Sequence, residues 1–335
     1  MHDVSRGVVL AADVGGTKTR LGLFSVGKRR PRPQAQQTYS SGMFFSLEEI
    51  VQDFCSRYPA SLRAACFGVA GPVENGRSIP VNLGWEVSEK NLRRAFQWPR
   101  VRVINDLFAT ALAIPLLRAN EVFSLNKGRA VSGGAAGLIA PGTGLGTTFL
   151  VRCDSCGDAV AMASEGGHAD FAPNDGAEAA LWEHLYRGCG HVSIERVLSG
   201  AGLVNIYEWL KACGRYREPT WLKNALQQAD PAKTIAQAAL NRRTPIAVAA
   251  VKRFSAIFGA AAGNLALTGM TTGGMYLGGG IAPKLLPFLR SGEFMKAFVN
   301  KGRFRNILQK IPVRVILNER AALLGAARCA VSQML

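Results

Sequence analysis

The chain has 335 residues, more than the roughly 250 to 300 at which a single hydrophobic core stops growing, so its length predicts two domains. Hydrophobic residues make up 48% and charged residues 19% of the sequence, a composition that excludes a disordered chain. The formal net charge of +17 is spread over small basic clusters. We therefore interpret it as a solvated surface that attracts small anions, and not as a nucleic-acid-binding face.

The sequence predicts neither a membrane span nor a secretion signal. Its longest apolar runs, such as residues 8–12 and 246–251, are far shorter than the roughly 20 residues that a bilayer requires. Seven cysteines at irregular spacing favour a reducing cytoplasm. Cys153 and Cys156 form a lone CxxC without a second pair, so free thiols are expected there in preference to a zinc site.

The first hundred residues alternate between strand and helix patterns. Residues 8–25 predict two strands around a Gly-Gly turn, which is a hairpin. Ser46 and Glu49 form a capping box for a helix that runs to about Tyr58, and residues 64–73 predict a buried strand. A helix near Ser88 and a strand at residues 101–104 follow. This alternation is typical of an α/β domain.

The later segments echo the opening ones. Residues 137–140 and 147–151 predict two more strands around a glycine-rich turn, and residues 313–319 resemble residues 101–106 before an Ala/Leu-rich helix. These echoes indicate two lobes of duplicated design. The middle of the chain, residues 176–266, is expected to be mainly helical, with N-caps at Ser193 and Ser199 and a C-cap at Gly214.

Three glycine turns are candidate phosphate-binding loops. The first, residues 13–17, places the Asp13 carboxylate at the end of a strand before two glycines, where it would face a phosphate-bound Mg²⁺, usually through water. The second is residues 140–146, and the third, residues 278–280, lies between a strand and a helix expected from Pro283. The second turn leads into a strand and no P-loop motif is present, so dinucleotide and P-loop folds are excluded.

Taken together, the motifs resemble the bacterial glucokinase family of the hexokinase and actin-like ATPase superfold. The likeness runs from residue 8 to 327 and is carried by residues 13–17, 104–106, 140–144, 164–173, 190–200 and 277–280. The resemblance implies a two-lobed ribonuclease H-like fold with an inter-domain cleft. We expect a small α/β domain of residues 1–114 plus 314–335, and a large α/β domain of residues 115–313 with a helical insertion.

The resemblance also implies roles for individual residues. Asp106 is expected to be the catalytic base that accepts the proton of the sugar 6-hydroxyl, although the tripeptide in isolation favours a helix cap at this position. The sugar is expected to contact Asn105, Asp106, Glu165, His168 and Glu195. The nucleotide is expected to contact Ala12, Asp13, Val14, Gly15, Gly16, Thr17, Gly142, Thr143, Gly144, Gly278, Gly279 and Gly280. Asp13 is the expected metal-facing residue, and Asp170 is left as structural.

The expected activity is ATP-dependent and Mg²⁺-dependent phosphorylation of glucose on its 6-hydroxyl, as a step of glycolysis in the cytoplasm. Two alternatives stay open: inorganic polyphosphate as a further donor, prompted by the charge, and a non-catalytic sugar sensor or transcriptional regulator on the same fold. The first strand begins too close to Met1 for a preceding helix-turn-helix, which disfavours the regulator. A homodimer is expected from the resemblance. Ala12 and Lys18 depart from the family pattern, and the zinc motif of the related ROK kinases does not follow His168.

Overall fold

The computed structural model describes residues 7–26, 30–80, 83–152 and 159–334. Within it the chain forms two compact units. The first unit comprises Met1–Glu121, Ala159–Ala161 and Asn318–Leu335, and the second comprises Val122–Asp158 and Met162–Leu317. Cys153 and Cys156, expected to be free thiols, and part of the basic cluster around Lys28 lie outside the described residues.

The first unit is built on a five-stranded sheet in the order β3-β2-β1-β4-β7. Strands β1 and β2 form the predicted antiparallel hairpin, β3 adds to it, and β4 and β7 run parallel to β1. The strands are β1 (Val8–Val14), β2 (Lys18–Ser25), β3 (Arg32–Ser40), β4 (Leu62–Val69) and β7 (Val101–Asn105), with the short β5 (Arg77–Ser78), β6 (Val87–Ser88) and β11 (Ala159–Ala161) outside this sheet.

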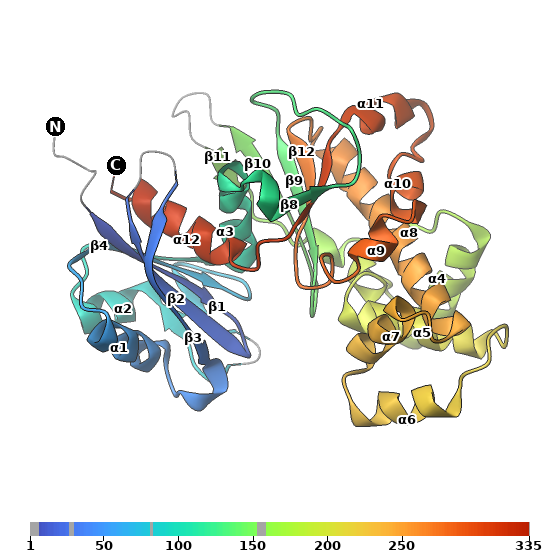
Figure 1. Ribbon diagram of the computed structural model, residues 1–335, viewed down its shortest axis with the longest axis horizontal. Coiled ribbons are helices and arrows are strands. Elements are labelled where there is room, and N and C mark those ends of the chain that lie inside the picture. Colours follow the sequence, from blue (N-terminus) through green and yellow to red (C-terminus); the bar gives the residue numbers. More distant parts are fainter. Residues whose placement is uncertain (1–6, 27–29, 81–82, 153–158, 335) are drawn as a thin grey trace. The chain divides into compact units, whose positions relative to one another are not determined.

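Helices cover both faces of this sheet (Figure 1). Alternation along β1 sends Leu10 and Ala12 to the core under α1 and α2, and Val9 and Ala11 to the core under α3 and α12. These helices are α1 (Leu47–Arg57), α2 (Glu89–Phe96), α3 (Asp106–Ala113) and α12 (Ala321–Ser332), with single turns at η2 (Ser41–Met43), η3 (Ile114–Leu116) and η4 (Ala119–Glu121). The last helix of the chain therefore helps to hold the first strand.

The second unit combines a sheet with a large helical layer. Its strands follow the order β10-β9-β12-β13-β8. They are β8 (Val122–Ser124), β9 (Ala136–Pro141), β10 (Leu145–Arg152), β12 (Gly274–Leu277) and β13 (Val313–Ile316). The helices are α4 (Gly176–Cys189), α5 (Gly200–Ala212), α6 (Thr220–Gln228), α7 (Pro231–Leu240), α8 (Pro245–Thr268), α9 (Leu286–Leu289), α10 (Glu293–Phe298) and α11 (Arg305–Lys310), with turns η5 (Gly166–His168), η6 (Ile194–Arg196) and η7 (Gly302–Phe304). One hydrophobic core joins sheet and helices.

The predicted duplication is confirmed by the strand order. In each unit an antiparallel hairpin, β1-β2 or β9-β10, is followed by two parallel strands, β4 and β7 in one and β12 and β13 in the other. The two echoing segments of the sequence are β7 and β13, which take equivalent places in the two sheets. Each is followed by a helix, α3 or α12, and both of these helices pack in the first unit.

Several local predictions hold, and three need correction. The Ser46 hydroxyl accepts the Glu49 amide at 3.2 Å, as the capping box predicted. The strand expected at residues 64–73 spans Leu62–Val69, because Gly71 turns the chain with φ +132°. The helix expected from Pro283 begins at Leu286. Ser193 precedes only the single turn η6 and makes no side-chain cap bond.

Helix α8 is a core helix of the second unit. Among the described residues it is the helix with the length and apolar composition of a membrane span, at 24 residues and a mean hydropathy of 1.4 in its most apolar window. However, 72% of that window is buried inside the protein. Its side chains Val251, Phe254 and Phe258 belong to the core, which accounts for its apolar sequence.

Candidate active site

Two carboxylates lie at the ends of β1 and β7, the two strands that flank β4 in the first unit. Asp13 is at the end of β1 and is paired in register with Gly68 of β4, and Gly68 is paired with Ile104 of β7, just before Asp106. A Cβ atom on Gly68 would lie 3.4 Å from the Ala12 carbonyl oxygen and 3.8 Å from the Asp106 Cα atom. The glycine thus lets the two strand ends and helix α3 approach closely.

The helix cap at this position is Asn105, and not Asp106. The Asn105 Oδ1 atom accepts the amides of Leu107 at 2.9 Å and Phe108 at 3.2 Å, and its Nδ2 atom donates to the Gly71 carbonyl at 3.0 Å. Asp106 is the first residue of α3, and its Oδ1 atom accepts the Leu107 amide at 2.8 Å. With Asn105 in the capping role, most of the hydrogen-bonding capacity of the Asp106 carboxylate stays uncommitted.

The surroundings make Asp106 a stronger base than an ordinary aspartate. Burial, together with the nearby charge of Asp13, raises the pKa of Asp106 to about 6. Burial also raises the pKa of Asp13, while the Arg20 guanidinium opposes that shift. A carboxylate whose pKa is close to neutral suits general-base catalysis, because it is ionised at physiological pH and still takes up a proton readily.

Arg20 is a site residue that the sequence analysis missed. Its Nη1 atom lies 3.2 Å from Asp13 Oδ2 and 3.5 Å from the Glu319 carbonyl oxygen. Asp13 and Arg20 face each other across the β1-β2 hairpin. The signal was present in the sequence, because a two-residue turn centred on Gly16 and Thr17 places Arg20 opposite Asp13.

The first glycine turn closes this hairpin. The Gly15 amide donates to the Lys18 carbonyl at 3.0 Å, and the Ser41 hydroxyl donates to the Gly15 carbonyl at 2.7 Å. Ala12 and Val14 are fully buried, so they present only backbone to any ligand, whereas Thr17 is exposed. The predicted nucleotide-binding segment of this unit is therefore a braced backbone turn with Asp13 beside it.

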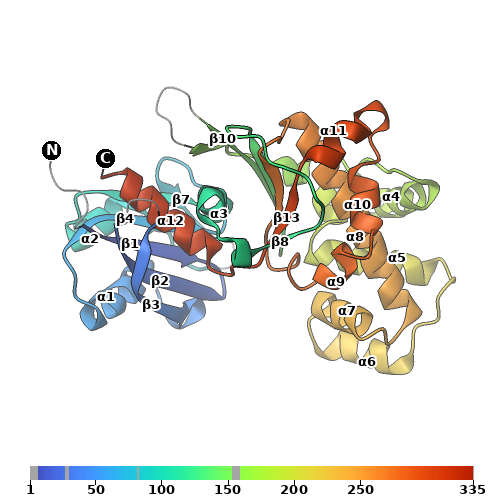
Figure 2. The same ribbon diagram turned by 45° about the horizontal axis from the view of Figure 1, so that its top comes forward.

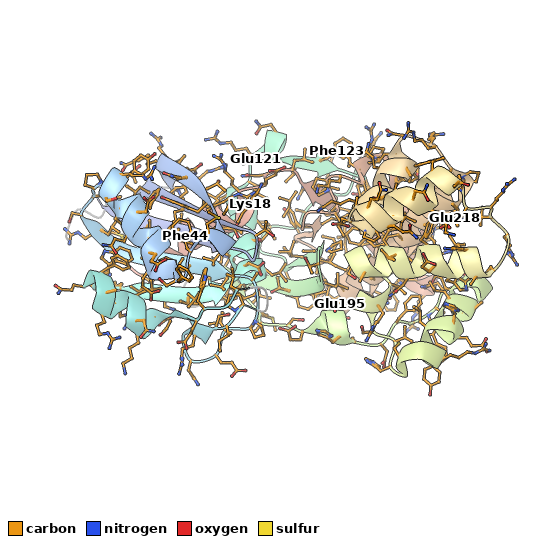
Figure 3. All side chains as sticks on the ribbon, turned by 90° about the horizontal axis from the view of Figure 1, so that it is seen from below. Lys18, Phe44, Glu121, Phe123, Glu195 and Glu218 are labelled. Carbon is orange, nitrogen blue, oxygen red and sulfur yellow. The ribbon has the colours of Figure 1, made fainter. Side chains whose placement is uncertain are left out.

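The second glycine turn, in the second unit, is held by Glu195 and by the start of α5. The Glu195 carboxylate, labelled in Figure 3, accepts the Leu145 amide through Oε2 at 2.8 Å. A Cβ atom on Gly144 would lie 2.6 Å from that same oxygen, so a larger residue there would displace the Glu195 carboxylate. The Gly142 carbonyl accepts the Gly200 amide at 2.8 Å. This places the N-terminus of α5 beside the turn, an arrangement suited to phosphate and not foreseen from the sequence.

The third glycine turn packs directly on the second. The Gly278 amide donates to the Ile139 carbonyl at 2.9 Å. A Cβ atom on Gly279 would lie 2.4 Å from the Pro141 carbonyl oxygen, and Gly279 has φ +74°, which side-chain-bearing residues rarely adopt. The predicted turns at residues 142–144 and 278–280 are thus brought together within one unit.

The segment containing Glu165 and His168 lies against the beginning of β10. A Cβ atom on Gly167 would lie 2.0 Å from the Leu145 carbonyl oxygen, so only glycine fits there. Gly166 donates its amide to the Ser164 hydroxyl, which is itself 3.0 Å from the Thr147 hydroxyl. Glu165 and His168 are both exposed at the two ends of turn η5.

A cavity of about 470 Å³ in the second unit unites several of the predicted residues. Its lining includes Thr143 of the second glycine turn together with His168 and Glu195, and also the α5 residues Ala201 and Asn205. Glu165 is not in this lining. Asp170 pairs with the lining residue His191, through His191 Nε2 and Asp170 Oδ1 at 2.8 Å.

The residues present fit a phosphate-bound divalent cation in the first unit. Asp13 and Asp106 supply two neighbouring carboxylates, and Arg20 is the cation hydrogen-bonded to Asp13. The excess of negative charge suits Mg²⁺, which needs few protein ligands when phosphate oxygens and water complete its shell. In the part of the chain that the structure describes, no group of three or more His, Cys, Asp or Glu side chains forms a self-sufficient metal site.

Comparisons with known proteins agree on one family. The family model for glucokinase matches residues 10–333. The glucokinase of Synechocystis sp. is 38% identical, with 96% of this chain and 97% of that protein covered. A crystal structure of glucokinase from an Antarctic psychrotroph is 30% identical over 97% of this chain and 99% of that one, with a TM-score of 0.87.

A more distant structure shares the fold alone. The ROK family glucokinase from Streptomyces griseus, solved with glucose and AMPPNP, is 22% identical and gives a TM-score of 0.63 over 97% of this chain and 100% of that one. The architecture is therefore the α/β fold of the actin-like ATPases, as predicted. With a family model that spans nearly its whole length and close relatives of one name, this chain belongs to the glucokinase family.

Proposed function

We propose that the protein is an ATP-dependent glucokinase, which transfers the γ-phosphate of ATP to the 6-hydroxyl of glucose and releases glucose 6-phosphate and ADP. Family membership supports the activity. The observation that carries the mechanism is Asp106, a partly buried carboxylate that accepts the Leu107 amide, with a pKa of about 6 and Asp13 as its charged neighbour. Asp106 accepts the proton of the 6-hydroxyl as that oxygen attacks the γ-phosphorus.

The sugar is held by hydrogen bonds from the residues predicted for it. Glu195, His168 and Glu165 come from the second unit, and Asn105 comes from the first. Glu195 keeps one carboxylate oxygen, Oε1, free while Oε2 braces the glycine turn. Asn105 keeps one amide proton, because its other groups are used by α3 and Gly71. Paired donors and acceptors of this kind suit vicinal sugar hydroxyls.

The nucleotide phosphates bind at backbone turns. Residues 12–17 of the first unit and residues 142–144 and 278–280 of the second present backbone amides, with the α5 N-terminus adding a favourable dipole. Asp13 would hold Mg²⁺, and the metal would supply neutralisation of phosphate charge.

The enzyme works in the cytoplasm, as a homodimer, in the first step of glucose use by glycolysis. A coupled assay tests the activity by following sugar-dependent ADP formation with glucose, mannose, fructose and glucosamine. The expected result is turnover with glucose and ATP. Turnover that depends on polyphosphate and not on ATP would replace the proposed donor. No phosphorylation of any hexose, with specific DNA retained at physiological salt, would replace the enzyme with a regulator.

A further inference from the structure

The second unit contains a further cavity that the proposed reaction does not use. It has a volume of about 870 Å³ and is formed by helices α4, α5, α8, α10 and α11, several of which are labelled in Figure 2. None of its lining residues lines the cavity that contains Thr143, His168 and Glu195. A volume of this size lies in the range of about 300 to 1,000 Å³ that is usual for small-molecule sites.

The inner part of this cavity is electrostatically balanced. Arg253 of α8 donates to Asp175 Oδ2 at 2.6 Å and to Glu178 Oε1 at 3.2 Å, and the Asn174 amide donates to Glu178 Oε2 at 2.9 Å. Glu178 is only 2% exposed, so this network is a fixed wall. Next to the lining residue Asn300, the half-buried Lys301 is attracted by Glu178, and burial lowers its pKa.

The outer part carries an excess of positive charge. Its cations come from four different segments of the chain, and among the described residues none of them has an ion-pair partner: Arg215, Lys252, Lys296 and Arg305. Against these four stands one carboxylate without a partner, Glu293. Cations from separate helices that converge on one hollow create a local potential that attracts a multiply charged anion.

The remaining wall suits an organic group. Tyr216 and the alanines at positions 249 and 256 of α8 supply partly exposed apolar and aromatic surface, and the mostly buried Trp209 and Leu210 of α5 complete this part of the lining. An inorganic anion would leave this surface unused, whereas the base of a nucleotide or the ring of a sugar phosphate would cover it.

From this juxtaposition we propose that the cavity between α4, α8 and α10 is a second ligand site, which binds an organic phosphate through Lys252, Lys296, Arg215 and Arg305. The ligand is a nucleotide or a sugar phosphate, whose phosphate meets the cationic rim and whose organic part lies against Tyr216 and the α8 alanines. The site is separate from the reaction centre, so the inference does not depend on the proposed kinase mechanism.

Equilibrium dialysis of the full chain with labelled ADP and, separately, labelled glucose 6-phosphate tests the proposal at physiological salt. We expect one of the two ligands to occupy an additional binding site on each chain, besides its site at the reaction centre. The double variant Lys252→Met/Lys296→Met should weaken that additional site at least tenfold. The matched control Lys127→Met/Lys223→Met removes the same charge from exposed lysines outside the cavity and should bind as the wild type does.

A spectroscopic readout locates the additional site. Because Trp209 lines the cavity, occupation of the site should change tryptophan fluorescence, and Trp209→Phe should remove that change. Glucose phosphorylation without added ligand should stay at the wild-type rate in both lysine double variants, so a failed kinase mechanism and a failed second site give different results.

Three results would overturn the proposal. One is saturation of both ligands at the reaction centre alone. Another is equal binding by the cavity variant and its control. The last is a change of oligomeric state in Lys252→Met/Lys296→Met, measured by light scattering, without any loss of ligand binding, which would make the cavity a contact between copies of the chain.

Discussion

The two units use the same strand order for different chemistry. In the first unit the hairpin turn follows Asp13 and the third parallel strand leads into Asp106, so both strand ends carry carboxylates. In the second unit the equivalent hairpin turn follows Pro141, and the carboxylate beside it, Glu195, comes from turn η6 and already accepts an amide. Both units of the duplicated fold therefore have a hairpin turn that presents backbone groups. The uncommitted carboxylate, Asp106, is found in the first unit.

The largest effect should come from exchanging the carboxylates for amides in the two units. Asp106→Asn should lower kcat by about 10²- to 10⁴-fold, because the amide cannot accept the hydroxyl proton. Glu195→Gln should instead raise the KM for glucose and lower kcat much less, since Glu195 holds the turn and its proposed role is to bind the sugar. Steady-state kinetics with glucose, together with glucose binding measured by calorimetry, separate the two. Near-normal turnover in Asp106→Asn would show that Asp106 is not the general base.

A smaller effect is expected from the contact that positions α3. A Cβ atom on Gly325 of α12 would lie 1.6 Å from the Ala109 carbonyl oxygen of α3, so Gly325→Ala forces the helices apart. We expect a loss of about 1–3 kcal/mol in unfolding free energy, accompanied by lower kcat because Asp106 begins α3. Gly42→Ala is the matched control, since a Cβ atom there meets nothing within 4 Å. Equal denaturation midpoints for the two variants would contradict the close approach.

The pH dependence of kcat/KM tests whether the carboxylates of the first unit control the reaction. Because Asp106 must be ionised to act and its pKa is about 6, kcat/KM should fall about tenfold per pH unit below pH 6. Arg20→Met removes the cation that balances Asp13, so the pKa of Asp106 should rise and the acidic limb should move to higher pH. Arg20→Lys should restore part of the shift. A limb that stays in place in Arg20→Met would show that Arg20 does not act on Asp106 through Asp13.

The smallest effect concerns how the melting temperature changes with pH. The pKa of Asp106 is about 6 in the folded state and near 3.8 without the fold, so the folded state binds more protons between these values and its stability falls as pH rises through that window. Asp106→Asn should therefore raise the melting temperature by a few degrees above pH 6, with the gain shrinking as pH falls toward 4. The same melting temperature for variant and wild type at pH 8 would argue against a destabilised carboxylate.

Much of the local structure could be predicted because it depends on neighbours in sequence. The Gly-Gly turn predicted the β1-β2 hairpin, and Ser46 with Glu49 predicted the start of α1. The predictions failed where a distant contact intervened. Gly71 ends β4 early in a left-handed conformation and offers its carbonyl to Asn105, a partner 34 residues away. No pattern around Gly71 encodes that partner.

The sequence alone determined the family, the duplicated hairpins and the residue types of the site, because motifs and alternation are local properties of the chain. Only the tertiary structure decided which of those residues are free to react. Asn105 took the helix cap and left Asp106 uncommitted, and burial beside Asp13 moved the pKa of Asp106 toward neutrality. These properties arise from desolvation and from charges brought close by strand pairing, and both depend on how segments far apart in the sequence pack together.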